Sequence, residues 1–142
     1  MHRKGKQRDT LNLLKKIRKS IPNAIIRSTF IVGFPNETIQ DYQKLYRFVR
    51  DFRFDHVGVF AYSKEEGTRA ATYSHQVNEK TKLFRRDKLL NLQKTISYQK
   101  NLKHVGEVID GICINHDVNT NRYTFLTQFN APDDVDGSVF AV

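Results

Sequence analysis

The residues best suited to bind a ligand follow an apolar run in the first quarter of the chain. In the segment RSTFIVGFPNET, Gly33, Phe34 and Pro35 come directly after the run that ends at Val32. A glycine has no Cβ and lets a ligand or another backbone come close, and the proline stiffens the corner. The N–H groups at the start of the next helix could then receive an anionic or polar group. An ordinary strand-to-helix turn accounts for the same spacing, and on spacing alone it is the better explanation.

A second polar segment, YSKEEGT, begins at Tyr62 and contains the adjacent carboxylates Glu65 and Glu66. Paired carboxylates can divide the roles of acid and base in catalysis. Neighbours in sequence often point apart, however, so a solvated turn is the better interpretation of this pair.

Cys113 and His116 have a spacing that fits half of a metal site. Zinc needs about four ligands, and no second pair lies nearby in the sequence. We therefore expect these two side chains to pack or to face solvent, and we assign no metal ligand.

The hydrophobic pattern predicts the elements that position the corner. Residues 24–32 are rich in Ile, Val, Thr and Phe, which is typical of a strand. A helix follows, and its cap oxygen comes from Asn36 or Thr38. The run VGVFAY at 57–62 is almost continuously apolar, which predicts a second strand covered on both faces. Two further helices are expected, one near the N-terminus and one over about 78–103. The apolar stripes of the three helices are Leu11, Leu14, Ile17 and Ile21; Tyr42, Leu45, Tyr46, Val49 and Phe52; and Leu89, Leu92 and Ile96.

The alternation of helix and strand with short connections predicts right-handed βαβ units in a parallel sheet. Ligands of such sheets bind beyond the carboxyl ends of the strands, where both polar segments would lie. The pattern then changes to short strands and turns, so we place a domain boundary near 103–106. Two strands do not make a free-standing α/β sheet, and two or three do not close a barrel. Both halves look incomplete, as in part of a longer protein or a subunit that needs another chain.

Composition limits the compartment and the partners. Cys113 is the single cysteine, so an internal disulfide is impossible and a reducing, cytoplasmic setting is expected. An apolar run of about 18 residues is missing from the sequence, so we expect no membrane span. The formal net charge of +9 would attract RNA, a ribosomal surface or another acidic partner. The same charges could instead form solvated helix faces, since many lie in predicted helices: Lys15, Lys16, Lys19, Lys80, Lys82, Arg85, Arg86 and Lys88.

Three segments together resemble the radical-SAM methylthiotransferases: STFIVGFPNET, FDHVGVFAYSKEEGT and NLQKTISYQKN. The resemblance covers nearly the whole chain. It implies an α/β fold in which residues 1–104 form the C-terminal part of a radical-SAM partial (β/α) barrel, including the closing helix. Residues 105–142 would then begin an incomplete all-β, OB-like domain of the TRAM type. We expect the chain to be a C-terminal fragment, the product of a split gene, or the result of a mis-assigned start.

Within that family, three features are similar to the branch that modifies a ribosomal protein. They are Arg27-Ser-Thr-Phe in the first strand, Glu65-Glu66-Gly67-Thr68 in the second loop, and the late segment NAPDDVDGSVFAV. The implied reaction is methylthiolation of an aspartate of small-subunit ribosomal protein S12. Two alternatives stay open: a fragment of the enzyme that methylthiolates isopentenyl-adenosine in tRNA, and a non-catalytic module that binds ribosomal protein or RNA.

The resemblance also implies S-adenosylmethionine and two 4Fe–4S clusters as cofactors of the full-length family. Such a cluster needs several thiolates, which a chain with one cysteine cannot supply. We therefore expect the chain to be inactive by itself, and the catalytic residues are unknown. By position in the family's motifs, the cofactor would contact Thr29, Gly33, Phe34, Pro35, Tyr62 and Ser63, and the substrate would contact Arg27, Glu65 and Glu66.

Overall fold

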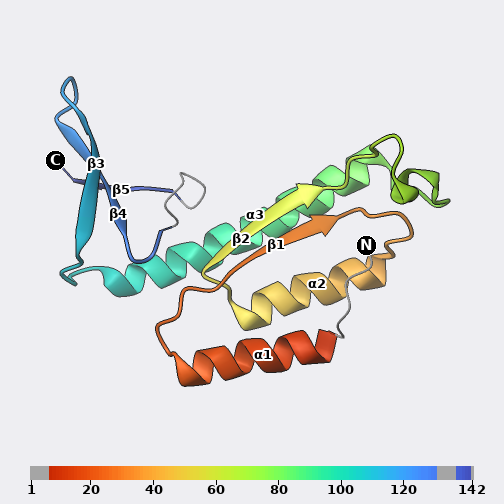
Figure 1. Cartoon of the computed structure of the whole chain (residues 1–142), viewed down its shortest axis with the longest axis horizontal. Helices are drawn as coiled ribbons and strands as arrows, with labels where there is room; N and C mark the ends of the chain where they lie inside the picture. The colour runs from red at the N-terminus through yellow and green to blue at the C-terminus, as the bar shows by residue number, and fades with distance from the viewer. Residues whose placement is uncertain (1–6, 131–136, 142) are drawn as a thin grey trace.

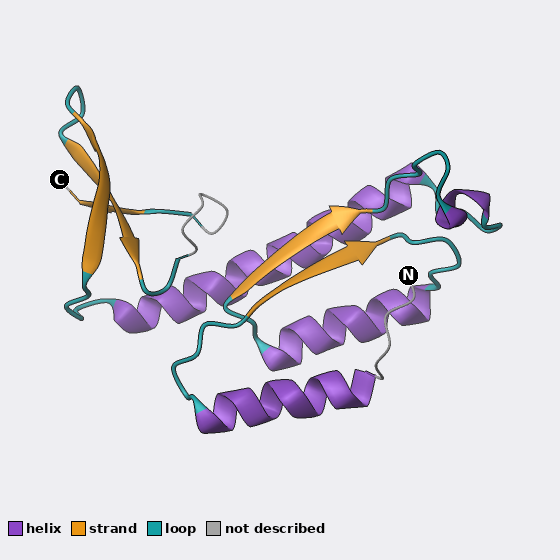
Figure 2. Cartoon of the chain, viewed as in Figure 1, coloured by secondary structure: helices purple, strands orange, loops and turns teal. Residues whose placement is uncertain are grey.

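The computed structural model describes residues 7–130 and 137–141 as a mixed α/β molecule with two small sheets (Figure 1, Figure 2). The predicted α/β class is confirmed. In chain order the elements are α1 (Gln7–Ser20), β1 (Arg27–Val32), α2 (Ile39–Phe52), β2 (His56–Ala61), the short 3₁₀ helix η1 (Arg69–Thr72), α3 (Glu79–Asn101), a second 3₁₀ helix η2 (Leu102–His104), β3 (Gly111–Asp117), β4 (Arg122–Thr127) and β5 (Val139–Ala141).

The first sheet consists of β1 and β2, which pair in parallel from Arg27 opposite His56 to Val32 opposite Ala61. Helix α2 connects the two strands, so the predicted strand–helix–strand unit is present. Parallel pairing brings the carboxyl ends of both strands to the same edge of the sheet. The two polar segments noted in the sequence both start at that edge.

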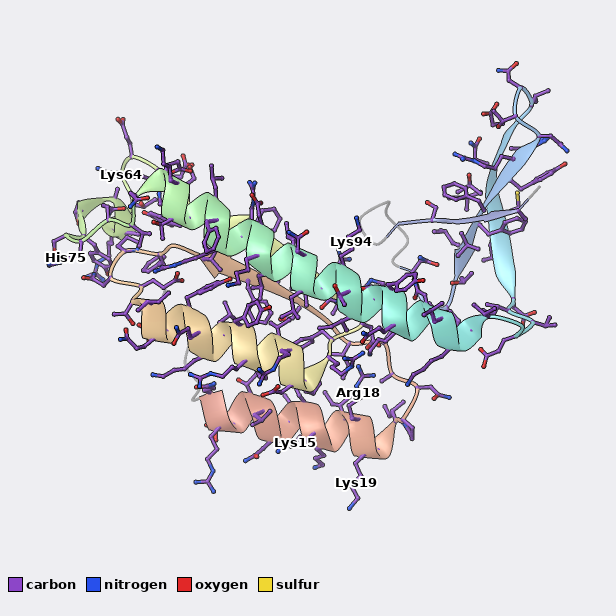
Figure 3. The ribbon with its side chains drawn as sticks, turned by 180° about the vertical axis from the view of Figure 1, so that it is seen from behind. Lys15, Arg18, Lys19, Lys64, His75 and Lys94 are labelled. Atoms are coloured by element: carbon purple, nitrogen blue, oxygen red, sulfur yellow. The ribbon has the colours of Figure 1, made fainter. Side chains whose placement is uncertain are left out.

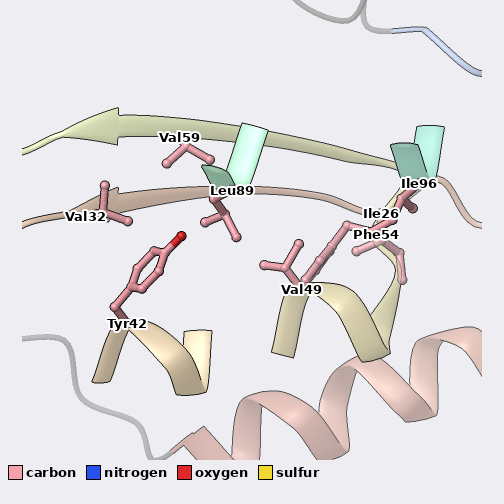
Figure 4. Packing of buried hydrophobic residues seen from close by; sticks show 8 residues of the cluster. All are labelled: Ile26, Val32, Tyr42, Val49, Phe54, Val59, Leu89 and Ile96. Carbon is pink, nitrogen blue, oxygen red and sulfur yellow. The ribbon is translucent and has the colours of Figure 1, made fainter. Parts of the chain in front are cut away.

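A core of buried side chains lies between this sheet and helices α2 and α3 (Figure 4). Aromatic contacts extend it, since the Phe54 ring lies 5.9 Å from the Phe30 ring and 5.4 Å from the Phe48 ring. Burying one large apolar side chain contributes about 1.5–3 kcal/mol, so this core holds the strands against the helices. Its members are Ile26, Val32, Tyr42, Val49, Phe54, Val59, Leu89 and Ile96.

The other face of the first sheet is exposed, which corrects the expectation that the second strand is covered on both faces. Phe60 of β2 is 62% exposed, and its partner Ile31 on β1 is 41% exposed. Their sequence neighbours Val59 and Val32 are buried, because successive side chains of a strand point to opposite faces. An apolar run alone did not distinguish one covered face from two. We call this surface, with Thr29, the open face.

Of the two predicted cap residues, Asn36 and Thr38, it is Thr38 that caps helix α2. The Asp41 N–H donates to Thr38 Oγ1 at 3.1 Å, and the Thr38 N–H donates to Asp41 Oδ2 at 3.2 Å. These reciprocal bonds form a capping box and fix the start of the helix three residues after the corner. None of the helices among the described residues is long and apolar enough to cross a membrane.

The second sheet is an antiparallel arrangement of β3, β4 and β5, in that order. It lies beyond the C-terminal end of the long helix α3 (Figure 1). A register shift between Cys113 and Asn115 breaks the regular pairing of β3 with β4. Almost all of β3 is exposed, so this small sheet buries little apolar surface in the described residues.

Candidate functional site

The corner and the second loop meet at the carboxyl edge of the first sheet. The Tyr62 N–H donates to the Val32 carbonyl at 2.9 Å, which continues the pairing of β1 and β2 by one residue. The Phe34 ring lies edge-on to the Tyr62 ring, with 5.2 Å between the centroids. Phe34 also lies 6.3 Å from the ring of Tyr73 in the following loop. The structure thus brings the two segments side by side.

Glycine is required at position 33 both by the backbone conformation and by the position of a neighbouring side chain. Its φ of +74° belongs to the left-handed region, which glycine adopts without a Cβ penalty. A Cβ at this position would lie 2.3 Å from Cγ of Lys82 on α3. The close approach that the glycine permits is therefore made by Lys82. The side of Gly33 where a Cβ would project is filled by protein.

A buried ion pair between Glu37 and Arg85 stabilises the corner. Arg85 of α3 donates from Nη1 to Glu37 Oε1 at 2.5 Å, and the same oxygen accepts the Gly33 N–H at 2.9 Å. The two side chains are only 7% and 13% exposed. A carboxylate that is bonded at once to a guanidinium and to a backbone N–H fixes both groups. Glu37 and Arg85 therefore connect the corner to helix α3.

Tyr42 of α2 completes this connection. Its hydroxyl donates to the Arg85 carbonyl at 3.1 Å, and the Arg85 guanidinium lies 5.5 Å from the centre of its ring. Burial raises the pKa of Tyr42 to about 12, so this phenol stays protonated and keeps donating its hydrogen bond throughout the physiological pH range.

The alternative of solvated helix faces, left open in the sequence, does not hold for Lys82 and Arg85. Each residue is only 6% exposed, because α3 packs along the sheet and directs these side chains toward the corner. The Lys82 ammonium lies 5.2 Å from the centre of the Tyr62 ring and 3.2 Å from Glu79 Oε2. The sequence offers one signal for this role, since Lys82, Arg85 and the buried Leu89 follow helical spacing on one side of α3.

Tyr62 supplies a polar atom without a partner. Its hydroxyl is buried and has no hydrogen-bond partner within the described part of the chain. A buried hydroxyl normally has a partner, and leaving it without one costs about 1–3 kcal/mol. Tyr62 is the residue after β2, and its ring contacts Phe34 of the corner, but the hydroxyl oxygen itself has almost no accessible surface.

The remaining predicted residues are spread more widely. Ser63 is exposed and donates to Glu65 Oε1 at 2.8 Å, and Glu66 is exposed as well. The two carboxylates have the exposure of a solvated turn. Thr29 lies on the open face, next to Gly58 of β2. Arg27 is at the opposite end of β1, which at about 3.3 Å per residue is roughly 16 Å from Val32, so the structure does not bring it to the corner.

Neither metal ligation nor a disulfide is indicated for the second sheet. Cys113 is exposed, and His116 stacks on Tyr123 with 4.0 Å between the ring centroids. Across residues 7–130 and 137–141, no three His, Cys, Asp or Glu side chains gather in a way that could hold a metal ion. The two residues face solvent or pack, as the sequence predicted.

A separate cavity of about 800 Å³ lies at the other end of the first sheet, between α3 and the second sheet. Asp55 lines it and accepts bonds from Arg18 Nη2 at 2.5 Å, from the Ile26 N–H at 2.7 Å and from Lys100. Burial alone would raise the pKa of Asp55, but these bonds outweigh it and hold the pKa below its ordinary value. His56 Nε2 lies 2.7 Å from the Phe129 carbonyl, so this region links the two sheets.

No family model matches the chain. Curated relatives match it along nearly its whole length. The ribosomal protein uS12 methylthiotransferase RimO of Pelotomaculum thermopropionicum is 45% identical over 141 residues, which is 99% of this chain and 32% of the relative. Proteins of the same name from Clostridioides difficile and Thermosynechococcus vestitus are each 41% identical, over 99% and 90% of this chain and over 31% and 28% of the relatives.

The chain spans about a third of the length of these relatives. The matches confirm the resemblance predicted from the three sequence segments, including the branch that modifies a ribosomal protein. They cover the corner, the second loop and the long helix, because the matched region includes 99% of the chain.

Proposed function

We propose that the chain forms the late barrel and the TRAM-type portion of a radical-SAM methylthiotransferase that acts on an aspartate of ribosomal protein uS12. The single observation that carries the proposal is 45% identity, over 99% of the chain, to a protein named for that activity. The parallel strand–helix–strand unit with two polar loops at its carboxyl edge supports it, because that edge is where α/β proteins bind ligands.

The corner fits S-adenosylmethionine in part. The flank of Gly33 is filled by Lys82, so a cofactor would use the aromatic rings of Phe34 and Tyr62 and the exposed side of β1 at Thr29. Pro35 and Ser63 would complete the cofactor side, and Glu65 and Glu66 on the adjacent loop would contact the substrate. When bound, S-adenosylmethionine supplies the methyl group and drives hydrogen abstraction.

The residues of this chain do not fit an iron–sulfur cluster. Cys113 is its single cysteine and lies on the exposed strand β3, away from the corner. The thiolates that hold such clusters must therefore come from sequence other than these 142 residues. We propose that the chain contributes one side of the cofactor site, at the corner, and the substrate-facing loop with Glu65 and Glu66. The rest of the enzyme would contribute the clusters.

The negative charge of residues 105–142 favours the ribosomal-protein branch over the tRNA alternative. Residues 105–142 contain six of the 15 acidic residues and only one of the 24 basic residues, Arg122. The Arg122 guanidinium lies 4.1 Å from the centre of the Phe140 ring. A unit with excess negative charge repels RNA phosphates and attracts a basic polypeptide. Residues 105–142 are thus better suited to contact a basic protein than tRNA.

A second candidate function is binding to the ribosome or to RNA without catalysis. The observation that favours it is the charge of residues 1–104, which carry the other 23 basic residues against nine acidic ones. The same residues 1–104 hold the proposed cofactor and substrate positions, so this charge does not separate the two candidates.

A chimera tests the proposed transferase function. This chain would replace the matching third of the Pelotomaculum thermopropionicum relative, with its cluster-binding part kept, and the unaltered relative would serve as the positive control. After anaerobic reconstitution, we expect mass spectrometry to show one methylthio group on the aspartate of a uS12 peptide. Modification of tRNA instead of the peptide would favour the other branch. A folded chimera that contains its clusters yet modifies neither substrate would refute the proposal.

A further inference from the structure

We propose that a groove between α2 and α3, on the helical side of the molecule, binds single-stranded RNA. The groove has a volume of about 230 Å³ and is lined by Tyr42, Gln43, Tyr46, Arg47 and Lys88. Tyr42 at the base of the groove is buried and also bonds to Arg85, whereas Gln43, Arg47 and Lys88 are exposed. The inference does not depend on the transferase function, because it uses none of the residues assigned to cofactor or substrate.

Two aromatic rings lie near the Lys88 ammonium: Tyr46, which lines the groove, and Phe84, which lies beside it on α3. The Lys88 ammonium lies 5.8 Å from the centre of the Tyr46 ring and 5.6 Å from that of the Phe84 ring. Phe84 and Lys88 are one helical turn apart on α3, so both point to the same side. Phe84 is 61% exposed, which is unusual for a phenylalanine in a helix that already has a buried face. Its ring is available for stacking.

The acidic side chains nearby have partners other than Arg47 and Lys88. Asp41 bonds with the Thr38 cap and lies 3.8 Å from Lys44, and Asp87 pairs with Arg86 at 2.8 Å. Arg47 donates from Nε to the Gln43 carbonyl at 3.3 Å. A guanidinium has five N–H donors, so this one bond orients Arg47 and leaves most of its donors for a phosphate.

Other cations on the helices add long-range attraction. Figure 3 shows Lys15 and Lys19 on α1 and Lys94 on α3. Residues 1–104 hold 23 basic and nine acidic residues, whereas 105–142 hold one and six. An RNA strand would therefore be drawn to the helices and repelled by the second sheet.

RNA fits this surface better than an acidic polypeptide does. Unpaired bases stack on aromatic side chains while the phosphates bind Lys and Arg, which uses both kinds of residue in the groove. Acidic side chains would use the cations alone and leave the Phe84 ring in water. In duplex RNA the bases stack on one another and are not free to stack on the Phe84 ring. The exposed ring therefore favours single-stranded RNA.

Fluorescence anisotropy with the purified chain and a labelled single-stranded RNA of about ten nucleotides tests the proposal. We expect Lys88→Ala to weaken binding and to lower the salt slope by about 0.7, the value for one lost phosphate contact on a single strand. Phe84→Ala should weaken binding about tenfold through lost stacking. Lys64→Ala removes the same charge from the exposed loop after β2 and is the matched control, with little change expected.

Three results would overturn the inference. One is an equal loss of affinity for Lys64→Ala and Lys88→Ala, which would mean diffuse attraction to net charge. Another is unchanged binding by Phe84→Ala, and the third is displacement of the RNA by polyglutamate at matched charge concentration. Circular dichroism of each variant confirms folding, and exposed Phe84 and Lys88 can both be truncated without opening the core. The chimera assay is unaffected by any of these outcomes, so the two proposals fail separately.

Discussion

Gly33 lies where β1 ends and the chain turns toward α2, and Lys82 packs against it. We predict that Gly33→Ala lowers the free energy of unfolding by about 2–4 kcal/mol, because a left-handed alanine costs about 1–2 kcal/mol and the overlap with Lys82 adds to it. Urea denaturation monitored by circular dichroism measures the loss. Gly67→Ala is the matched control, since Gly67 has a φ of +78° but a Cβ there would meet nothing within 4 Å. An equal loss in both variants would show that the Lys82 contact has no role.

The pair of Glu37 and Arg85 gives a second prediction. Arg85→Met should destabilise the chain by about 3–5 kcal/mol, because it leaves a buried carboxylate without its counter-charge. The double variant Glu37→Gln with Arg85→Met should lose less than the sum of the single losses, since the unpaired charge is gone. Equilibrium denaturation of the four proteins completes the cycle. Additive losses would mean that the two side chains do not interact.

At the scale of elements, Asp55 joins the end of α1, the start of β1 and the last turns of α3. Its folded pKa is lowered, so its contribution to stability is present above the unfolded pKa of about 3.9 and is lost as the pH falls through the folded value. We predict that Asp55→Asn lowers stability near pH 7 by about 2–3 kcal/mol, the value of a bond to a charged group. The variant should also lose less stability than the parent between pH 6 and pH 3, as followed by urea denaturation.

Asp117 provides the control for this prediction. Its pKa is also lowered, chiefly by a hydrogen bond from Thr120, but it is the last residue of β3, in the second sheet. Asp117→Asn should leave the acid-dependent loss of the α/β part unchanged. If both variants reduce the loss of stability between pH 6 and pH 3 equally, that reduction comes from the change in net charge and not from the Asp55 bonds.

The sequence predicted the elements better than it predicted their surroundings. The three apolar stripes and the Thr38 cap placed the helices within a few residues, because helical periodicity and capping are local properties. Coverage of the second strand was predicted wrongly, because burial of Phe60 depends on what packs against its face. In the same way, Lys82 and Arg85 carry charges that suit solvent, and only the packing of α3 against the corner buried them.

At the scale of the whole molecule, the open face is the largest departure from an ordinary α/β domain. Parallel sheets are normally covered on both faces, yet Ile31 and Phe60 are 41% and 62% exposed. We predict that Phe60→Thr reduces binding of a hydrophobic dye and self-association, with a change in stability within about 0.5 kcal/mol. Dye fluorescence and size-exclusion chromatography measure the two effects. Val59→Thr, one residue away and buried, should instead destabilise the fold by about 1–3 kcal/mol.

The sequence by itself determined which elements form, that a corner follows β1, and which methylthiotransferases the chain resembles. Each of these follows from local spacing or from motifs in linear order. Tertiary structure alone decided that Phe34 and Tyr62 meet and that Lys82 fills the flank of Gly33. The physical reason is that contacts between side chains far apart in sequence depend on how helices and strands pack, and one helix, α3, supplies the buried cations that hold the candidate site.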